Sequence, residues 1–307
     1  MTAFDADCNL TNELLAAWPT RAPEGLRRLF RPDRPLLIVG EGSSQLMPGG
    51  FLRACARAWG WSGGIDAVGG RAADTLDLAG RSVVCTSNSG RSREVVEAMP
   101  RQPADAFAVV GLPGGPLTRL NHHVLLPRPE LAVPATASVL ATALILAQAL
   151  AEACGREVPM AQLRSALRDC LAATPQVVGA ATVRRVFWVG GHAGVGAELA
   201  LKTMESTGLI GLDLPGSLGL HGIHEVLAPG DLVVGNDIAA ADQGELRKRV
   251  ETMCGATLLL PTYPDLGVWT PLIQLAAGWR ILAVVAAAQG RDPAVPRRAT
   301  KIGNPAA

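Results

Sequence analysis

The chain has 307 residues, 49% of them hydrophobic, and a formal net charge of +1, so it can bury a sizeable core and about two domains are expected. Its lysines and arginines are scattered, without the basic block that is typical of proteins that bind nucleic acid or a membrane surface. The long apolar runs, such as 131–153, are alanine-rich and interrupted by Pro134, which indicates buried helices rather than membrane spans. No charged-then-apolar leader opens the chain, and we therefore expect a cytoplasmic protein.

The six cysteines show neither a CxxC motif nor the spacing of metal ligands. Most of them lie in apolar surroundings, which predicts buried, reduced thiols. Walker and HExxH motifs are missing from the sequence, so nucleotide hydrolysis has no support. We expect neither a metal nor a cofactor.

Short apolar runs alternate with helical stretches along both halves of the chain. Strands are expected in PLLIVGEGSS (35–44), SVVCTSNSG (82–90), AFAVVGL (106–112), HHVLLP (122–127), RVFWVGGHAG (185–194), GDLVVGND (230–237) and ATLLLP (256–261). Helices are expected over 45–59, from near Ser89, after 185–194, over 134–174 as the link between the halves, and over 269–289. This alternation predicts an α/β protein with two similar, doubly wound domains, each with a parallel sheet covered on both faces.

Hydroxyl and amide side chains follow the first two apolar runs, where strands are expected to lead into helices. They are Ser43, Ser44, Ser87, Asn88, Ser89 and Ser92. In doubly wound sheets ligands bind at the carboxyl ends of the strands, and unpaired N–H groups at a helix start add further donors. These features favour a phosphate group. The alternative is an ordinary Ser or Asn helix cap, which needs only one of these residues.

The stretch LALKTMESTGLIGLDLPGSLGLHG (199–222) brings three proton-handling side chains close together in the sequence. Lys202 and Glu205 are three residues apart in an apolar helical run, and His221 follows a glycine-rich loop. Taken alone, the first two are typical of a surface ion pair, and the third of a loop histidine.

Taken together, these segments resemble the tandem sugar isomerase (SIS) domain family. The resemblance rests on the two-part plan, on SNSGRS after the second strand, on the pattern E-x-x-L-K-x-x-E, and on His221-Gly222 sixteen residues beyond Glu205. Nearest in layout are the isomerase half of glucosamine-6-phosphate synthase, the archaeal phosphoglucose/phosphomannose isomerases and the amino-sugar-phosphate deaminases. The resemblance covers the chain from about residue 35.

The resemblance implies two flavodoxin-like SIS domains in tandem. A helical segment (1–33) would precede a first SIS domain (34–155) that carries the sugar-phosphate loop. A helical connector (156–181) would lead to a second SIS domain (182–307), whose C-terminal tail closes the site.

The resemblance also implies roles for individual residues. Glu205 would move the proton between C1 and C2, and Lys202 or Lys301, in PRRATK (296–301), would stabilise the enediolate. His221 would help to open the sugar ring from the neighbouring subunit of a homodimer. The sugar phosphate would be bound by Ser43, Ser44, Ser87, Asn88, Ser89, Ser92 and Thr136. No metal or redox cofactor takes part.

The function predicted in this way is aldose–ketose isomerisation of a phosphorylated hexose or hexosamine, or deamination of an amino-sugar phosphate. A non-catalytic sugar-phosphate sensor and an etherase-type lyase of the same superfamily remain alternatives. Arg91 replaces a glutamate of the family, Ile223 replaces a proline, and His224 and Glu225 follow, so the identity of the sugar stays open. The matching strand of the second half ends in GND (235–237), without an SxSG segment, which predicts one composite site per subunit.

Overall fold

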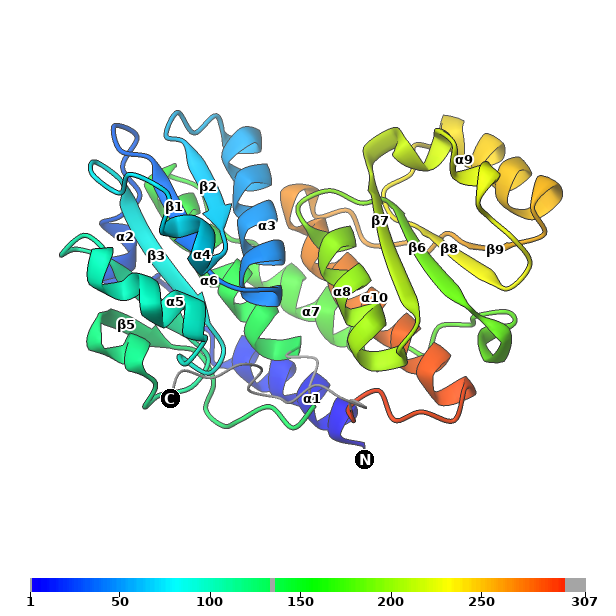
Figure 1. Cartoon of the computed structure of the whole chain (residues 1–307), viewed down its shortest axis with the longest axis horizontal. Coiled ribbons are helices and arrows are strands. Elements are labelled where there is room, and N and C mark those ends of the chain that lie inside the picture. Colours follow the sequence, from blue (N-terminus) through cyan, green and yellow to red (C-terminus); the bar gives the residue numbers. More distant parts are fainter. Residues whose placement is uncertain (1, 133–135, 296–307) are drawn as a thin grey trace. The chain divides into compact units, whose positions relative to one another are not determined.

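The computed structural model describes residues 2–132 and 136–295, and in it the chain divides into two compact α/β units. Among the described residues, unit 1 holds residues 2–131 and 136–164, and unit 2 holds residue 132 and residues 165–295. The division falls inside helix α7 (Met160–Ala172), which Figure 1 labels.

Unit 1 is built on a five-stranded parallel sheet with the strand order β2-β1-β3-β4-β5. Its strands are β1 (Leu36–Val39), β2 (Ile65–Val68), β3 (Ser82–Ser87), β4 (Phe107–Val110) and β5 (Asn121–Val124). Leu36 pairs with Ile65 on one side and with Ser82 on the other, which sets the register of the central strands. Every side chain of β1, β3 and β4 is buried, as expected for a parallel sheet covered on both faces.

Helices cover both faces of this sheet. They are α1 (Ala3–Ala16), α2 (Glu24–Arg27), α3 (Ser43–Trp59), α4 (Gly70–Ala73), α5 (Arg93–Ala98) and α6 (Thr136–Ala153), with short 3₁₀ turns η1 (Met99–Arg101) and η2 (Pro116–Arg119). Leu37 and Val39 belong to the core cluster that also contains Ala73 of α4 and Val95 of α5. On the other face α3 packs against α6, and α6 against α1 (Figure 1).

Unit 2 is built on a four-stranded parallel sheet with the order β7-β6-β8-β9. Its strands are β6 (Arg185–Gly190), β7 (Ile210–Pro215), β8 (Asp231–Gly235) and β9 (Thr257–Leu259). Its helices are α8 (Val195–Thr207), α9 (Ala240–Arg247) and α10 (Thr270–Ala288), with the short turns η3 (Ala180–Thr182), η4 (Gly216–Leu220), η5 (Ile223–Glu225), η6 (Lys248–Met253) and η7 (Gly267–Trp269).

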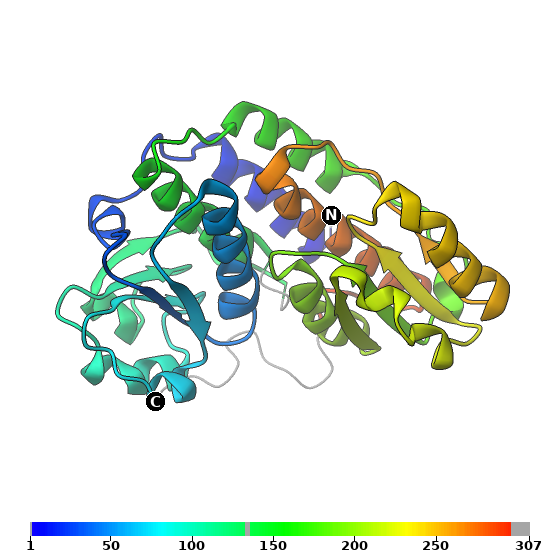
Figure 2. The same cartoon turned by 90° about the horizontal axis from the view of Figure 1, so that it is seen from above.

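Alternating side chains of β6 divide the core of unit 2 into two layers. Phe187 and Val189 belong to the cluster that contains Leu246 of α9. Trp188 points to the other face, where its indole N–H donates to the Thr203 hydroxyl of α8 at 3.0 Å. Helix α10 runs alongside α8, as both ribbon views show (Figures 1 and 2). Gly278 allows this close packing, since a Cβ there would lie 2.4 Å from the Leu199 methyl groups.

The segment Gly267–Ala288 is long and apolar enough to cross a membrane by length and composition alone. Of its most apolar 18-residue window, 61% is buried inside the structure. The segment contains α10, whose apolar side chains lie in the core of unit 2. This burial is typical of the core helix of a globular protein.

The structure confirms the predicted architecture of two parallel-sheet α/β units and corrects several elements. The strands β2 and β7 were not predicted, and β7 occupies the first half of what the sequence indicated as a glycine-rich loop. The helical stretch 134–174 consists of two helices, α6 and α7. All six cysteines are free; Cys8, Cys55 and Cys85 are buried as predicted, whereas the other three are only partly buried. Burial raises the pKa of Cys55 and Cys85 to about 12.

Candidate active site

The two hydroxyl-rich loops of unit 1 lie at the switch point of its sheet. Strands β1 and β3 are neighbours, but β1 connects to β2 on one side while β3 connects to β4 on the other. The loops that leave their carboxyl ends, GEGSS (40–44) and SNSGRS (87–92), therefore diverge from one edge of the sheet. This is the place where open α/β sheets bind ligands.

The loop after β3 is held by hydrogen bonds among its own serines. The Ser87 hydroxyl lies 2.9 Å from that of Ser92 and accepts the N–H of Gly90 at 3.1 Å. The Ser89 hydroxyl accepts the N–H of Arg91 at 3.1 Å. These bonds fix the loop in a tight curve before a ligand arrives, and Gly90 (φ +66°) adopts the left-handed conformation that the curve requires.

An ordinary helix cap does not explain these serines. Ser92 stands at the N-cap of α5 but makes no side-chain capping bond, because its hydroxyl is directed to Ser87. Ser43 and Ser44 are the first residues of α3, after Gly42 at the N-cap. The Thr86 hydroxyl donates to the Ser44 carbonyl at 2.8 Å and thereby joins the two loops.

A buried carboxylate that the sequence analysis missed ties this loop to the start of α6. Glu130 accepts the side-chain N–H of Asn88 at 2.9 Å, the N–H of Ser138 at 3.0 Å and the Ser138 hydroxyl at 2.9 Å. Asn88 is thus oriented by an acceptor that only its amide nitrogen can satisfy. The only feature of the sequence that points to Glu130 is its position shortly before an apolar helical run. Thr136 was predicted to bind the sugar phosphate, and its side chain lies outside the described residues.

In unit 2, helix α8 carries three charged side chains on one face. Lys202 Nζ lies 2.7 Å from Glu205 Oε2 and 3.6 Å from Glu198 Oε1. The spacings of four and three residues place both carboxylates beside the ammonium group. Glu198 was part of the sequence motif but was not predicted as a site residue.

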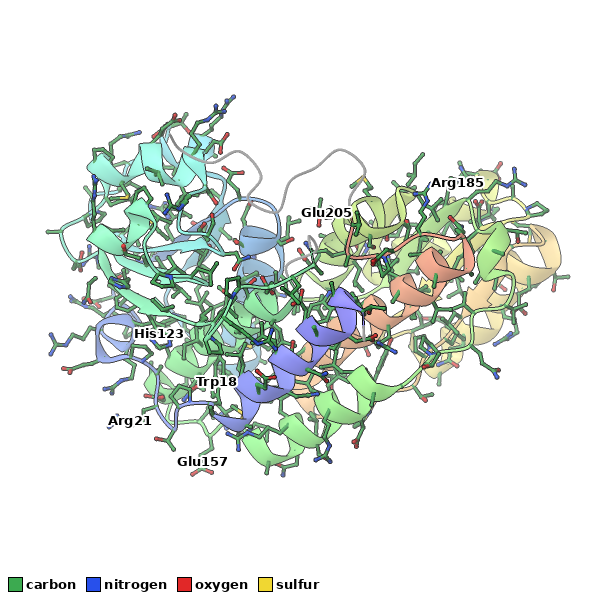
Figure 3. The ribbon with its side chains drawn as sticks, turned by 90° about the horizontal axis from the view of Figure 1, so that it is seen from below. Trp18, Arg21, His123, Glu157, Arg185 and Glu205 are labelled. Atoms are coloured by element: carbon green, nitrogen blue, oxygen red, sulfur yellow. The ribbon has the colours of Figure 1, made fainter. Side chains whose placement is uncertain are left out.

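The burial of this cluster excludes a surface ion pair. Lys202 is only 3% exposed and Glu198 is fully buried, whereas the side chain of Glu205 is 27% exposed. Figure 3 labels Glu205 on its helix. Glu205 is therefore the member of the cluster that a ligand can reach. Of the three, it is also the one with the predicted role of base.

Among the described residues, His221 is not joined to this cluster. His221 follows η4, its imidazole is exposed, and no hydrogen bond links it to Lys202 or Glu205 in the described part of the chain. Lys301 lies outside the described residues. The loop at 87–92 and helix α8 belong to different units, and their meeting in one composite site stays a prediction.

Asp213, on strand β7, is a further titratable group, and its side chain lies against the first turn of α8. The Asp213 carboxyl of β7 lies so close to Gly196 that a Cβ there would be 2.0 Å from Asp213 Oδ1. This oxygen is buried and has no hydrogen-bond partner among the described residues. Burial raises the pKa of Asp213 to about 6.

Solved structures share this fold over nearly the whole chain. Glucosamine-6-phosphate deaminase from Thermotoga maritima is 20% identical, with a TM-score of 0.79 and coverage of 97% of both chains. The C-terminal domain of glucosamine-fructose-6-phosphate aminotransferase from Francisella tularensis is 15% identical, with a TM-score of 0.71 over 95% of this chain and 97% of that one. Tagatose-6-phosphate ketose/aldose isomerase from Escherichia coli is 16% identical, with a TM-score of 0.69 over 96% and 94%.

At these identities the likeness establishes the fold alone. No protein-family model matches the sequence, and neither does any curated protein. Within residues 2–132 and 136–295, no group of three or more His, Cys, Asp or Glu side chains is arranged to hold a metal ion.

The raised pKa of Asp213 predicts how stability changes with pH. The folded protein keeps this proton up to about pH 6, whereas the unfolded chain releases it near the ordinary value of 3.8. Its contribution to the free energy of unfolding should therefore fall as the pH rises from about 4 to about 6. Asp213→Asn should remove that part of the slope in urea denaturation, while Asp242→Asn, at an exposed position, should not. An unchanged slope in Asp213→Asn would contradict the assignment.

Proposed function

We propose that the chain is a sugar-phosphate aldose–ketose isomerase with two SIS-type domains, acting on a phosphorylated hexose or hexosamine. Deamination of an amino-sugar phosphate is the variant of the same proton-transfer chemistry. The observation that carries the proposal is the buried Lys202 with a partly exposed Glu205 beside it, on a helix of this fold. The proposal places the protein in the cytoplasm.

The names of the similar structures support the substrate class. The deaminase acts on glucosamine 6-phosphate, the isomerase on tagatose 6-phosphate, and the aminotransferase is named for glucosamine and fructose 6-phosphate. All three names describe a phosphorylated hexose or hexosamine. We extend this class to the present chain because its unit 1 has a preformed hydroxyl loop at the sheet edge where such ligands bind.

The proposed reaction uses Glu205 as the base. Its carboxylate removes the C2 proton of the open-chain aldose, the electron pair forms the C1–C2 double bond, and the aldehyde oxygen takes up the negative charge. The O2 proton then moves to O1, the O2 electron pair forms the C2 carbonyl, and Glu205 returns its proton to C1, which completes the ketose. The ammonium group of Lys202 or of Lys301 stabilises the enediolate charge, and His221 assists ring opening.

The phosphate would be bound by hydroxyls and N–H groups rather than by a basic side chain. Arg91, at the position of the family's glutamate, donates to the Gly114 carbonyl at 2.8 Å and is thereby held at the loop. Ser89 and Ser92 offer hydroxyl groups beside the first turn of α5. Such donors satisfy a phosphate dianion without a bound cation.

The proposed homodimer is supported by the surface of unit 2. Strand β7 is an edge strand, and it exposes Ile210 and Leu212 by 56% and 42%. Leu218, in the turn after it, is 50% exposed. A hydrophobic edge strand invites pairing with another chain, and these side chains lie in the segment that leads to His221. A symmetric contact there would carry His221 towards the partner's site.

The phosphate loop can be tested on ligand affinity. The double variant Ser87→Ala/Ser89→Ala should weaken binding of glucose 6-phosphate by at least about a hundredfold, since hydrogen bonds to a charged group are worth about 1.5–3 kcal/mol each. Binding of glucose should change far less. Ser82→Ala, a buried serine at the opposite end of β3, is the matched control in calorimetry. Equal losses for both ligands would remove the phosphate assignment.

Assembly can be tested by sedimentation. Leu212→Lys places a charge on the exposed edge strand and should shift the protein from a dimer to a monomer. Val178→Lys changes another apolar side chain of unit 2, 78% exposed, and should leave the dimer intact. A wild-type monomer with full activity would rule out the shared site.

The base can be tested by hydrogen exchange. Glu205→Gln keeps an oxygen that can accept from Lys202 but cannot take up a proton. Turnover should fall by about 10² to 10⁴, while affinity for the sugar phosphate stays within a few-fold. The measurement is deuterium incorporation at C1 and C2 from D₂O, followed by NMR over a panel of phosphorylated hexoses and hexosamines.

Glu251→Gln is the control for this experiment, because Glu251 is paired with Arg247 away from α8. Near-native turnover in Glu205→Gln would show that another group is the base. If the wild-type protein binds sugar phosphates but never incorporates deuterium, the sensor function replaces the isomerase.

A further inference from the structure

A separate cavity of about 580 Å³ lies in unit 1, away from the two serine loops. It is bordered by the segment after α1, the last turns of α6, the α6–α7 connection and the first turns of α7. Figure 3 labels Trp18, Arg21 and Glu157, which are among its lining residues. No residue of the loops 40–44 and 87–92 lines it.

The cavity carries an excess of positive charge. Arg21, Arg156 and Arg164 line it together with two carboxylates, Glu152 and Glu157. Glu152 accepts the N–H of Ala22 at 2.6 Å and lies 3.7 Å from Arg21 Nε and 3.5 Å from Nε of Arg27, which is outside the lining, so Arg156 and Arg164 are the arginines that Glu152 does not pair with. Three guanidinium groups and two carboxylates therefore line the cavity. The excess of one positive charge favours an anion, and guanidinium groups suit the oxygens of a phosphate monoester.

One of these guanidinium groups has a donor that the protein does not satisfy. Arg164 Nε is buried and has no hydrogen-bond partner among the described residues. A buried donor without an acceptor costs free energy, and more so on a charged group. An anionic oxygen in the cavity would remove this cost.

The floor of the cavity is held in place by hydrogen bonds. The indole N–H of Trp18 donates to Gln148 at 2.6 Å, and the amide of Gln148 donates to the Pro19 carbonyl at 3.2 Å. The segment after α1 is therefore fixed against α6. The opposite wall includes the apolar side chains of Val158 and Met160. A rigid floor, arginines and an apolar wall form a preorganised site for an anion that has an apolar part.

We propose that this cavity is a second anion site, which binds a small organic phosphate. The phosphate group lies against Arg156 and Arg164, whose planar forks suit two oxygens each. The organic part lies against Val158 and Met160. A ligand bound here does not occupy the substrate loop, so the site is suited to a regulatory phosphate. The proposal does not depend on the reaction proposed above.

Isothermal titration with inorganic phosphate and with phenyl phosphate tests the site, using the full chain in the Ser87→Ala/Ser89→Ala background. Both ligands should bind saturably, and phenyl phosphate more tightly because of its apolar part. Arg156→Gln and Arg164→Gln should each weaken binding about tenfold or more, from the loss of a charged hydrogen bond. Glu157→Gln should tighten it. Arg168→Gln, which changes an exposed arginine of α7 one turn beyond Arg164, should leave it unchanged.

Three results would overturn the proposal. Loss of all saturable binding in the Ser87→Ala/Ser89→Ala background would place the phosphate at the loop instead. An equal effect of Arg156→Gln and Arg168→Gln would show non-specific attraction by surface charge. Equal affinity for benzoate and phenyl phosphate would show a carboxylate site. Arg156 is exposed in the α6–α7 connection, so its variant can be tested even if Arg164→Gln lowers stability.

Discussion

The ammonium group of Lys202, almost fully buried in unit 2, is the constraint around which α8 is arranged. Removing a charge from water costs several kcal/mol unless partners compensate for it. Glu198 and Glu205, one turn before and one turn after, provide that compensation. A protein with well-packed apolar residues in place of such a cluster is often at least as stable, so stability alone does not account for the presence of the cluster. The contacts of Trp188 with Thr203 and of Gly278 with Leu199 hold the helix, and hence the cluster, in place.

Unit 1 uses a buried carboxylate for a different purpose. Glu130 accepts hydrogen bonds from donors of the loop after β3 and of the first turn of α6. The loop is thus fixed from within by Ser87 and Ser92, and from outside by Glu130. The phosphate proposed to bind here would meet donors already in position, and little conformational entropy would have to be lost on binding.

The sequence predicted the architecture because buried parallel strands are continuous apolar runs, and seven of the nine strands in the described part of the chain overlap such a run, although β5 itself reads NHHV and is partly exposed. The two that were missed, β2 and β7, are partly exposed and contain aspartate, so their pattern resembles a loop. The same limit applies to the site. Spacing placed Lys202 beside Glu205, but only the packing of α8 in the fold reveals that the lysine is buried. Glu130 and Asp213 were missed because burial of a carboxylate depends on neighbours distant in the sequence.

The arrangement of the three charges on α8 also gives Glu198 a role in the proposed reaction, in which Glu205 is the base. In the proposed reaction Glu205 takes up a proton and becomes neutral. With Glu205 as its only partner, the buried Lys202 would then be left as an uncompensated ammonium, and the cost would be added to the barrier. Glu198, fully buried and 3.6 Å from Lys202 Nζ, keeps the ammonium paired throughout. Glu205 is free to exchange its proton with the substrate because the buried charge does not depend on it alone.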